Sequence, residues 1–235
     1  MRIAAMADVH AKGEEDQPRV TKLLADAAED ADVILLGGDL TDHGRQSEAE
    51  GLLAAVRDLD VPVVAVLGNH DHESGCASEL EAILRSGGVH CLEGQGVVID
   101  GVGFAGAKGF AGGFGRNVVR AFGEDALKAF VNASVVEAQG LRGALRALDA
   151  QVKVALTHYS PVLATVATEP AEIHSFLGAS RLGAAIDEGG ATIAFHGHAH
   201  HGALEGRTEG GVPVYNVSLP VLRDAAGASH LLIEV

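Results

Sequence analysis

The feature that most limits how this chain can fold is a short apolar run that stops abruptly at polar residues. Its best example is the stretch 61–71, VPVVAVLGNHD, in which six of the first seven residues are apolar and a glycine then precedes Asn69, His70 and Asp71. A run of this length and composition is typical of a fully buried strand and is too short for an ordinary helix. Because ligands of open α/β sheets bind just beyond the carboxyl ends of the strands, we expect the chemistry of this chain at Gly68–Asp71.

The same apolar run with a polar break recurs along the chain and predicts an α/β sheet. Strands are expected at 2–7, 32–37, 61–67, 152–157 and 191–195. Leucine, valine and alanine recur with helical spacing between the early runs, at 17–30, 46–59 and 77–86. Strands that alternate with such helices form parallel sheets, in which all the strands end at one edge.

A change of pattern near residue 97 indicates a second sheet layer. Residues 97–106 (VVIDGVGFAG) alternate in polarity and turn at Asp100-Gly101, which predicts a hairpin. Helices are then expected at 124–148 and 176–188, and strands at 203–206, 212–217 and 229–235 would complete the second sheet. The sequence has no internal repeat and no convincing interdomain linker, so we expect one domain over residues 1–235.

Composition limits the class of protein. The chain has 235 residues, of which 47% are hydrophobic, and this suits a globular domain with a large core. No apolar run approaches the roughly 20 residues that span a bilayer, so we expect no membrane segment. The N-terminal MRIAAMADVH reaches Asp8 too soon for a signal peptide, and the expected location is the cytoplasm. Cys76 and Cys91 are the only cysteines, too few for a disulfide framework or a cysteine metal site.

The formal net charge of −15 constrains the binding partners. It disfavours a basic groove of the kind that binds extended duplex nucleic acid. A small anionic substrate is compatible with this charge, because bound metal ions dominate the local field of a site.

The polar residues that end the predicted strands are of the types that bind metal ions. They are Asp8 and His10, Asp39, Asn69 and His70, His158, and His198 and His200. Histidines with a purely structural role would not be expected to lie at the end of a buried strand in every case. Imidazole, carboxylate and amide ligands without a thiolate suit Mn, Fe, Zn or Co, and this set is large enough for two ions. Two ions about 4 Å apart favour phosphoryl transfer, because they activate a bridging hydroxide and hold the attacking and leaving oxygens in line.

These clusters resemble the five sequence blocks of the calcineurin-like metallophosphoesterase superfamily, in the same order. The blocks are Asp8-Val9-His10, Gly38-Asp39-Leu40-Thr41-Asp42, Gly68-Asn69-His70-Asp71, His158, and Gly197-His198-Ala199-His200. The resemblance implies an α/β fold with two mixed sheets in a four-layer α-β-β-α sandwich, and a site for two metal ions. Within the superfamily the chain looks most like the compact bacterial phosphodiesterases.

The resemblance also implies a role for each residue of the blocks. Asp8, His10 and His200 would bind one metal ion, and Asn69, His158 and His198 would bind the other. Asp39 would bridge the two ions. His70 would contact the phosphate and protonate the leaving group, and Asp71 would orient the His70 ring, since an imidazole needs a fixed tautomer for acid catalysis.

Further residues are weaker candidates for substrate contact, beside Asn69 and His70. Lys108 and Arg116 lie in the glycine-rich stretch 107–120, which could close over a phosphate or could simply be a solvated connection. His174 lies in a loop, 160–175, long enough to reach the site. Asn216 resembles a site-adjacent asparagine of small family members, and the alternative is an ordinary turn residue at a strand end.

The resulting first hypothesis is a metal-dependent hydrolase of a phosphodiester, such as a cyclic nucleotide or another small nucleotide diester. Protein Ser/Thr phosphatases carry arginines beside their second and third blocks, where this chain has Asp42-His43-Gly44 and Val66-Leu67, and this argues against that activity. The alternative is a phosphomonoesterase that acts on a nucleotide or sugar phosphate. A non-catalytic interaction module is a third hypothesis, and the complete ligand set argues against it.

Overall fold

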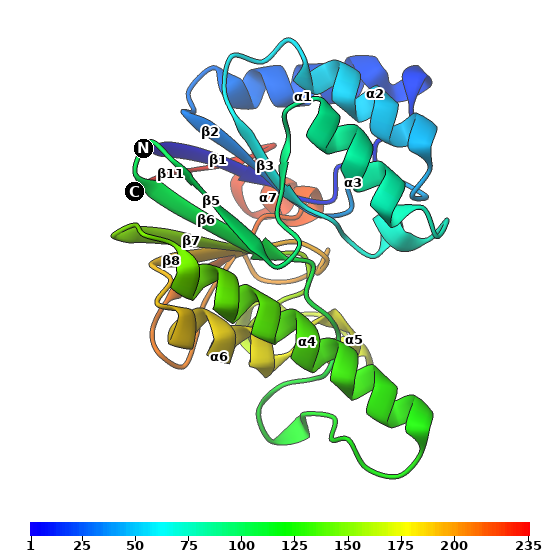
Figure 1. Ribbon diagram of the computed structural model, residues 1–235, viewed down its shortest axis with the longest axis vertical. Coiled ribbons are helices and arrows are strands. Elements are labelled where there is room, and N and C mark those ends of the chain that lie inside the picture. Colours follow the sequence, from blue (N-terminus) through cyan, green and yellow to red (C-terminus); the bar gives the residue numbers. More distant parts are fainter.

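The structure is a computed structural model of residues 1–235, in which two β-sheets pack face to face between two layers of helices. Helices α1, α2 and α3 cover the outer face of one sheet, and α4 and α6 cover the other (Figure 1). The α-helices are α1 (Gln17–Ala28), α2 (Gln46–Val56), α3 (Ala77–Ser86), α4 (Asp125–Ala147), α5 (His174–Leu177), α6 (Ser180–Gly189) and α7 (Leu219–Ala226). Short 3-10 helices lie at Glu14–Asp16, His70–His72, Gly115–Asn117, Leu163–Thr165 and Ala171–Ile173. This is the four-layer sandwich that the family resemblance implied.

The first sheet has the strand order β11-β1-β2-β3-β4. Its strands are β1 (Arg2–Met6), β2 (Val33–Gly37), β3 (Val63–Val66), β4 (His90–Cys91) and β11 (Leu231–Glu234). The pairs β1–β2, β2–β3 and β3–β4 are parallel, so these strands end at the same edge. The prediction that the last strand belongs to the second sheet is wrong. Strand β11 pairs antiparallel with β1, where its alternating half-buried and exposed side chains suit an edge strand.

The second sheet has the order β5-β6-β7-β8-β10-β9. Its strands are β5 (Gln95–Ile99), β6 (Val102–Ala107), β7 (Val152–Thr157), β8 (Ile193–His196), β9 (Glu205–Arg207) and β10 (Pro213–Asn216). The predicted hairpin is β5–β6, and its turn residues Asp100 and Gly101 both have positive φ, at 47° and 82°. Strands β6, β7, β8 and β10 are parallel neighbours, so their carboxyl ends also share one edge.

Two apolar cores hold the layers together. The larger contains 38 buried residues and joins Ile34 and Leu36 of the first sheet to Phe104, Leu156 and Phe195 of the second. The smaller contains 16 buried residues and lies between α4, α6 and the outer face of the second sheet. Each large aliphatic side chain that is fully buried contributes about 1.5–3 kcal/mol to the free energy of folding, so the larger core fixes the two sheets relative to each other.

Two elements differ from the sequence-based expectation. The helix predicted over 176–188 is two helices, α5 and α6, which are separated at Gly178-Ala179. Gly178 has an extended backbone and forms a bridge with Ser160, and this conformation ends α5. A Cβ at Gly178 would overlap the Ser160 carbonyl oxygen, so this close approach requires glycine. Helix α7 was not expected, although Pro220 near its start and the left-handed Gly227 after its end are a typical pair of helix-end signals.

None of the helices is both long enough and apolar enough to cross a membrane.

Candidate metal centre

The polar residues that follow the parallel strands of both sheets lie together at one edge of the molecule. Three groups of side chains place their ligand atoms within 4.8 Å of one another: Asp8 with His10 and His200, His10 with Asp39 and His70, and Asp39 with His158 and His198. His10 and Asp39 each belong to two groups, so the three groups form one continuous cluster. Asn69 joins it, because its Oδ1 lies 2.9 Å from His158 Nε2. All seven residues expected as metal ligands therefore lie close together.

The backbone at this edge is held in an unusual conformation. Five residues other than glycine have positive φ, and four of them are Asp8, His10, Asp39 and His198, with φ between 46° and 71°. This region costs roughly 1–2 kcal/mol for each residue with a Cβ, and such strain concentrates at functional sites. The glycines beside these residues allow the close approach. A Cβ on Gly38 would lie 2.5 Å from His158 Nδ1, and one on Gly68 would overlap the Asp39 carboxylate.

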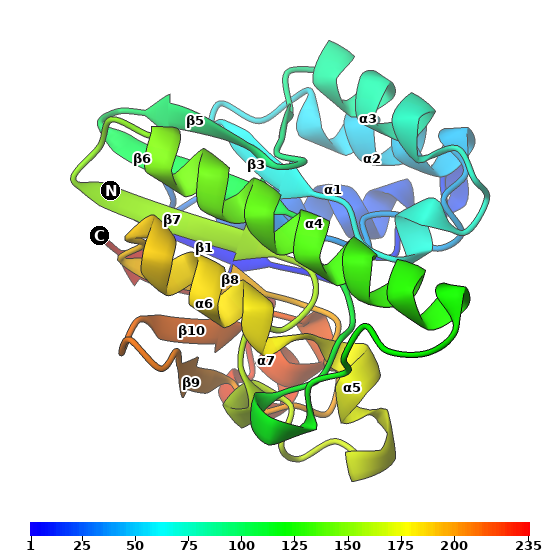
Figure 2. The same cartoon turned by 60° about the horizontal axis from the view of Figure 1, so that its bottom comes forward.

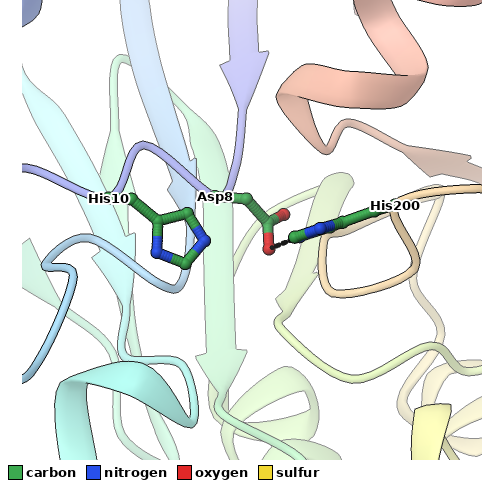
Figure 3. A group of neighbouring side chains, drawn as sticks. All are labelled: Asp8, His10 and His200. Carbon is green, nitrogen blue, oxygen red and sulfur yellow. Dashed lines mark hydrogen bonds and ion pairs between the residues drawn. The ribbon is translucent and has the colours of Figure 1, made fainter.

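Asp8, His10 and His200 form the first part of the cluster (Figure 3). Asp8 and His10 follow β1, whereas His200 comes from the loop after β8, and its Nε2 lies 2.9 Å from Asp8 Oδ1. The backbone N–H of His198 also donates to Asp8 Oδ2 at 3.0 Å, so Asp8 joins the ends of two strands from different sheets. His10 Nδ1 lies 3.4 Å from Asp42 Oδ1, and its Nε2 lies 3.9 Å from Asp39 Oδ2. The Nε2 atom therefore faces the carboxylates of the cluster and is the His10 atom that could bind an ion.

Asp39, Asn69, His158 and His198 form the second part. His158 Nδ1 donates to the Gly37 carbonyl at 2.9 Å, which leaves Nε2 directed at two oxygens, Asn69 Oδ1 at 2.9 Å and Asp39 Oδ1 at 3.3 Å. The lone pairs of His158 Nε2, Asn69 Oδ1 and Asp39 Oδ1 thus point at one another and repel. A proton or a metal ion between these three atoms removes the repulsion. His198 Nε2 lies 3.3 Å from the Phe176 carbonyl and donates to it, which leaves Nδ1 as the ligand atom. The donor set fits a metal ion.

Burial and charge set the protonation of this part of the cluster. Burial alone would raise the pKa of Asp39, but the adjacent His158 outweighs it and lowers that pKa well below its usual range. Burial alone would lower the pKa of His158, but the Asp39 carboxylate outweighs it and raises that pKa to about 9. Burial lowers the pKa of His198 to about 4, so its imidazole is neutral. Metal ligands must be deprotonated, so Asp39 and His198 are in the required state and a metal would displace a proton from His158.

His70 stands at the open side of the cluster, and its side chain is 38% exposed. Its Nδ1 donates to the Asp42 carbonyl at 2.7 Å, and its backbone N–H donates to Asp39 Oδ1 at 2.8 Å. The ring lies edge-on to the His10 ring, with centroids 4.6 Å apart. Because Nδ1 is engaged by a carbonyl, Nε2 is the nitrogen available to a bound substrate.

Asp71 contacts different groups from those expected. Its carboxylate accepts hydrogen bonds from the backbone N–H groups of Leu40, Thr41 and Gly68 and from the Thr41 hydroxyl. It has no hydrogen bond to the His70 ring, whose orientation is set by the carbonyl of Asp42. Burial raises the pKa of Asp71, which is fully buried. Asp71 therefore ties the loop that carries Asp39 to the loop that carries Asn69 and His70.

The clustered residues all fall within a stretch that matches a known protein family. The model of that family, described as calcineurin-like phosphoesterase, matches residues 1–202. The chain belongs to the calcineurin-like phosphoesterase family. The matched residues include every strand end that contributes to the cluster, from Asp8 to His200. No curated protein matches the sequence significantly.

Solved structures share the fold of this phosphoesterase. Phosphopantetheinyl hydrolase from Mycobacterium tuberculosis has a TM-score of 0.72 and 14% identity, over 98% of this chain and 95% of the other. The protein TT1561 of Thermus thermophilus has a TM-score of 0.52 and 15% identity, over 92% and 88% of the two chains. A hypothetical protein from the same organism has a TM-score of 0.51 and 16% identity, over 100% and 88%. At these identities the similarity shows a common fold.

Two of the weaker candidates make hydrogen bonds within the protein. Asn216 is fully buried; its Nδ2 donates to the Ala199 carbonyl at 2.7 Å, and its Oδ1 accepts from Ser218 N at 3.1 Å. It therefore holds the loop that carries His198 and His200. His174 begins α5 and is half-buried, and its Nε2 donates to the Glu169 carbonyl at 2.9 Å. Substrate contact by His174 stays a prediction.

The two basic candidates, Lys108 and Arg116, lie in different surroundings. Lys108 is 12% exposed, pairs with Glu137 at 3.6 Å and donates to the Gly109 carbonyl, so its charge is already compensated. Its own carbonyl accepts from His158 N at 3.0 Å, which fixes the end of β7. Arg116 lines a separate cavity that includes none of the candidate metal ligands. The glycine-rich stretch therefore does not bring both cations to the cluster.

The contacts that sequence reasoning missed are backbone carbonyls. Those of Gly37, Asp42 and Phe176 orient His158, His70 and His198 respectively. No residue type marks a carbonyl acceptor, so the sequence contains no signal for them. His196, which is adjacent to the cluster, is fully buried and contacts Thr165 Oγ1 through Nε2 at 2.8 Å, and burial lowers its pKa to about 4. It supports the loop after β7 and is outside the ligand groups.

Proposed function

We propose that this phosphoesterase is a hydrolase of phosphodiesters that depends on two metal ions. The observation that carries the proposal is the convergence of Asp39, Asn69 and His158 lone pairs beside Asp8, His10, His198 and His200, with His70 at the open side. Asp8, His10 and His200 would hold one ion and Asn69, His158 and His198 the other, with Asp39 shared. Mn, Fe and Zn are the ions that suit these ligands. When bound, such ions neutralise phosphate charge and lower the pKa of an attacking water.

The residues of the chain supply the remaining steps. The surrounding structure holds Asp8, His10, Asp39 and His198 in a strained backbone conformation, so their ligand atoms are in place before substrate arrives and less reorganisation is needed during the reaction. His70, protonated on Nε2, donates that proton to the leaving oxygen as the bond from phosphorus to that oxygen breaks. The neutral ring that results carries its remaining proton on Nδ1, where the Asp42 carbonyl accepts it at 2.7 Å. The contact thus favours the tautomer that proton transfer produces.

The charges around the cluster favour a diester over a monoester. Lys108 pairs with Glu137, and Arg19, which donates to the carbonyls of Val9 and His10, pairs with Asp16. Lys12, which is more exposed, lies 3.8 Å from the Asp42 carboxylate. Each of these three cations already has a carboxylate partner in the chain, which leaves less positive charge for a second negative charge on the phosphate. A diester carries one negative charge near neutral pH and a monoester close to two, so the diester requires less compensation beyond the metal ions.

An assay with two aryl substrates tests the proposal. Bis(4-nitrophenyl) phosphate and 4-nitrophenyl phosphate are incubated with the protein, with Mn²⁺ and with a chelator, and nitrophenolate release is measured. We expect faster turnover of the diester, dependence on the metal, and loss of turnover in Asp39→Ala but not in Asp30→Ala, which changes an exposed carboxylate. Preference for the monoester would support the alternative, a nucleotide or sugar phosphate monoesterase. No turnover of either substrate would support a non-catalytic module.

The physiological substrate requires a wider panel. Cyclic nucleotides and small nucleotide diesters are the first class to test, since they follow from the proposed diester preference. The structural neighbour from Mycobacterium tuberculosis is named a phosphopantetheinyl hydrolase, so phosphopantetheinyl esters are a second class to test. A substrate that is turned over by the wild-type protein and not by Asp39→Ala would identify the class.

A further inference from the structure

A large cavity lies outside the metal centre. Its volume is about 860 Å³, which falls within the roughly 300–1,000 Å³ of pockets that hold small organic ligands. It opens to solvent and is lined by the 3-10 helix at Gly115–Asn117, the chain at 161–164, one side of α6 and the end of β9. Figure 2 shows α6 and β9 on this side of the molecule. None of the residues of the metal cluster lines it. The proposed hydrolysis therefore does not account for it.

The carboxylates around this cavity are mostly engaged within the protein. Asp187 accepts hydrogen bonds from the Thr208 hydroxyl and from Gly210 N, the latter at 2.8 Å. Glu188 pairs with Arg142 at 2.7 Å and with Arg146 at 3.8 Å. Only Glu209, which is exposed at the rim, remains without such a partner. The acidic groups therefore offer little binding capacity to a cation.

Two of the arginines around the cavity have donors to spare. Arg116 is exposed and makes no ion pair. Arg207 is also exposed and uses only Nη1, to bind the Gly211 carbonyl at 2.9 Å. Arg181 donates from Nη2 to the Val119 carbonyl at 2.9 Å, and its Nη1 is buried beside Gly112 and Ser134, away from the cavity. Arg116 and the remaining donors of Arg207 can therefore bind an anion in the cavity through charge-assisted hydrogen bonds.

Part of the wall is apolar. Phe114 and Val162 are buried, and Leu163 is 46% exposed beside them. A ligand that matches both features has an apolar body and an anionic group. We propose that this cavity binds an organic anion with an apolar body, an aryl or acyl group that carries a phosphate, sulfonate or carboxylate. Its charged group pairs with Arg116, and its body packs on Phe114, Val162 and Leu163.

One cluster of side chains connects this cavity to the metal centre. Phe114 packs with Val166, Leu177 and Ala199, and Ala199 lies between His198 and His200. The two sites are separate but share a wall. Binding in the cavity must therefore be measured on metal-stripped protein, so that the probe is neither hydrolysed nor held by metal ions.

The test uses 8-anilinonaphthalene-1-sulfonate, an aromatic body with one sulfonate, as the probe. The chain has no tryptophan, so Leu163→Trp places a single tryptophan at the cavity. Val98→Trp is the matched control, because Val98 is also 46% exposed but lies on β5, away from the cavity. We expect saturable energy transfer from tryptophan to the probe in Leu163→Trp, at one probe per chain, and none in Val98→Trp. Ala184→Trp on α6 is a second reporter if Leu163→Trp does not fold.

Charge reversal identifies the binding group. In the Leu163→Trp background, Arg116→Glu should weaken probe binding by about tenfold or more, because it replaces an attraction with a repulsion. Arg120→Glu makes the same charge change at an exposed residue that does not line the cavity, and binding should be unchanged. Equal energy transfer from the tryptophans at both positions, equal affinity in the two charge variants, or no saturable binding would overturn the proposal.

Discussion

His70 differs from the other histidines of the cluster in its surroundings. It is the most open of them to solvent after His200. Its Nδ1 donates to the Asp42 carbonyl at 2.7 Å, and the Glu73 carboxylate is farther away, at 3.9 Å. His158 and His200, by contrast, each lie within 3.3 Å of an Asp oxygen. The hydrogen bond to the Asp42 carbonyl fixes the tautomer of the His70 ring and leaves Nε2 for a substrate.

We predict that His70→Ala slows hydrolysis without removing metal. General acid catalysis is worth about 10²–10⁴-fold, and its loss matters most when the leaving group is a poor one. The measurement is kcat for a bis-aryl diester and for an alkyl aryl diester whose alkoxide must leave, with metal content determined on the same samples. The alkoxide substrate should lose more activity. Loss of metal from the variant would show that His70 is a ligand and would contradict the assigned role.

Glu93 gives a pH-dependent prediction away from the ligands. Its Oε1 accepts from Leu67 N at 2.9 Å, and burial raises the pKa of its carboxyl from 4.5 to about 7. The folded protein therefore holds this proton more tightly than the unfolded chain. The stabilisation that results is complete below pH 4.5 and is lost as the pH rises through about 7.

Glu93→Gln removes this titration and keeps an oxygen for Leu67 N. Relative to wild type, the variant should gain roughly 3 kcal/mol of unfolding free energy between pH 4.5 and pH 8, and should be the more stable protein at pH 8. Urea denaturation at the two pH values measures it, with the exposed Glu29→Gln as control. A difference between wild type and Glu93→Gln that does not change with pH would rule out the raised pKa.

At the scale of the elements, the loops after β2 and β3 behave as one unit because Asp71 joins them. Its two carboxylate oxygens accept from Leu40, Thr41 and Gly68, so either oxygen faces donors only. An amide in this place would direct its NH₂ group at backbone N–H groups. Replacing one buried acceptor in this way costs about 1–3 kcal/mol for each unsatisfied group.

Asp71→Asn should therefore lower the unfolding free energy by about 2–3 kcal/mol. It should also weaken metal binding, since Asp39 and Asn69 lie on the two loops that it releases. Thermal or urea denaturation and a metal titration measure the two effects, and Asp30→Asn provides an exposed control. Wild-type stability in Asp71→Asn would show that the hydrogen-bond network around this carboxylate is not needed.

Most elements could be predicted from their own residues. Helix α3 over Ala77–Ser86 and strand β7 over Val152–Thr157 lie where the apolar spacing predicted them. The break between α5 and α6 could not, because it depends on contact with Ser160, a residue distant in sequence. The sheet that β11 joins could not be predicted either, because the apolar pattern of a strand indicates how buried its side chains are and not which strand it pairs with.

The same distinction applies to the candidate site. The alternation of strands and helices predicted that parallel strands end at one edge. Asp8, Asp39, Asn69 and His158 follow such strands and lie close together in the structure. The carbonyl partners of the histidines and the braces formed by Asp71 and Asn216 depend on backbone geometry that residue types do not encode. Arg116 was misplaced for the same reason, because the path of a glycine-rich loop is set by its tertiary contacts.

At the scale of the whole molecule, we propose that residues 1–235 form one domain. The larger core includes side chains of both sheets, from Ile3 to Leu222, so neither sheet keeps its inner face covered without the other. Denaturation should therefore be a single cooperative transition, with the same midpoint by circular dichroism and by tyrosine fluorescence, both in the metal-stripped protein. Two separated transitions would show that the halves fold independently.

The metal centre depends on the whole molecule, because its candidate ligands come from both sheets. We propose that this shared edge holds two metal ions that drive diester hydrolysis. The most direct test titrates metal-stripped protein with Mn²⁺ while hydrolysis of bis(4-nitrophenyl) phosphate is recorded. We expect activity to rise from zero and to saturate at about two equivalents per chain, and Asp39→Ala to stay inactive throughout. Full activity in the stripped protein, or saturation at one equivalent, would contradict this proposal.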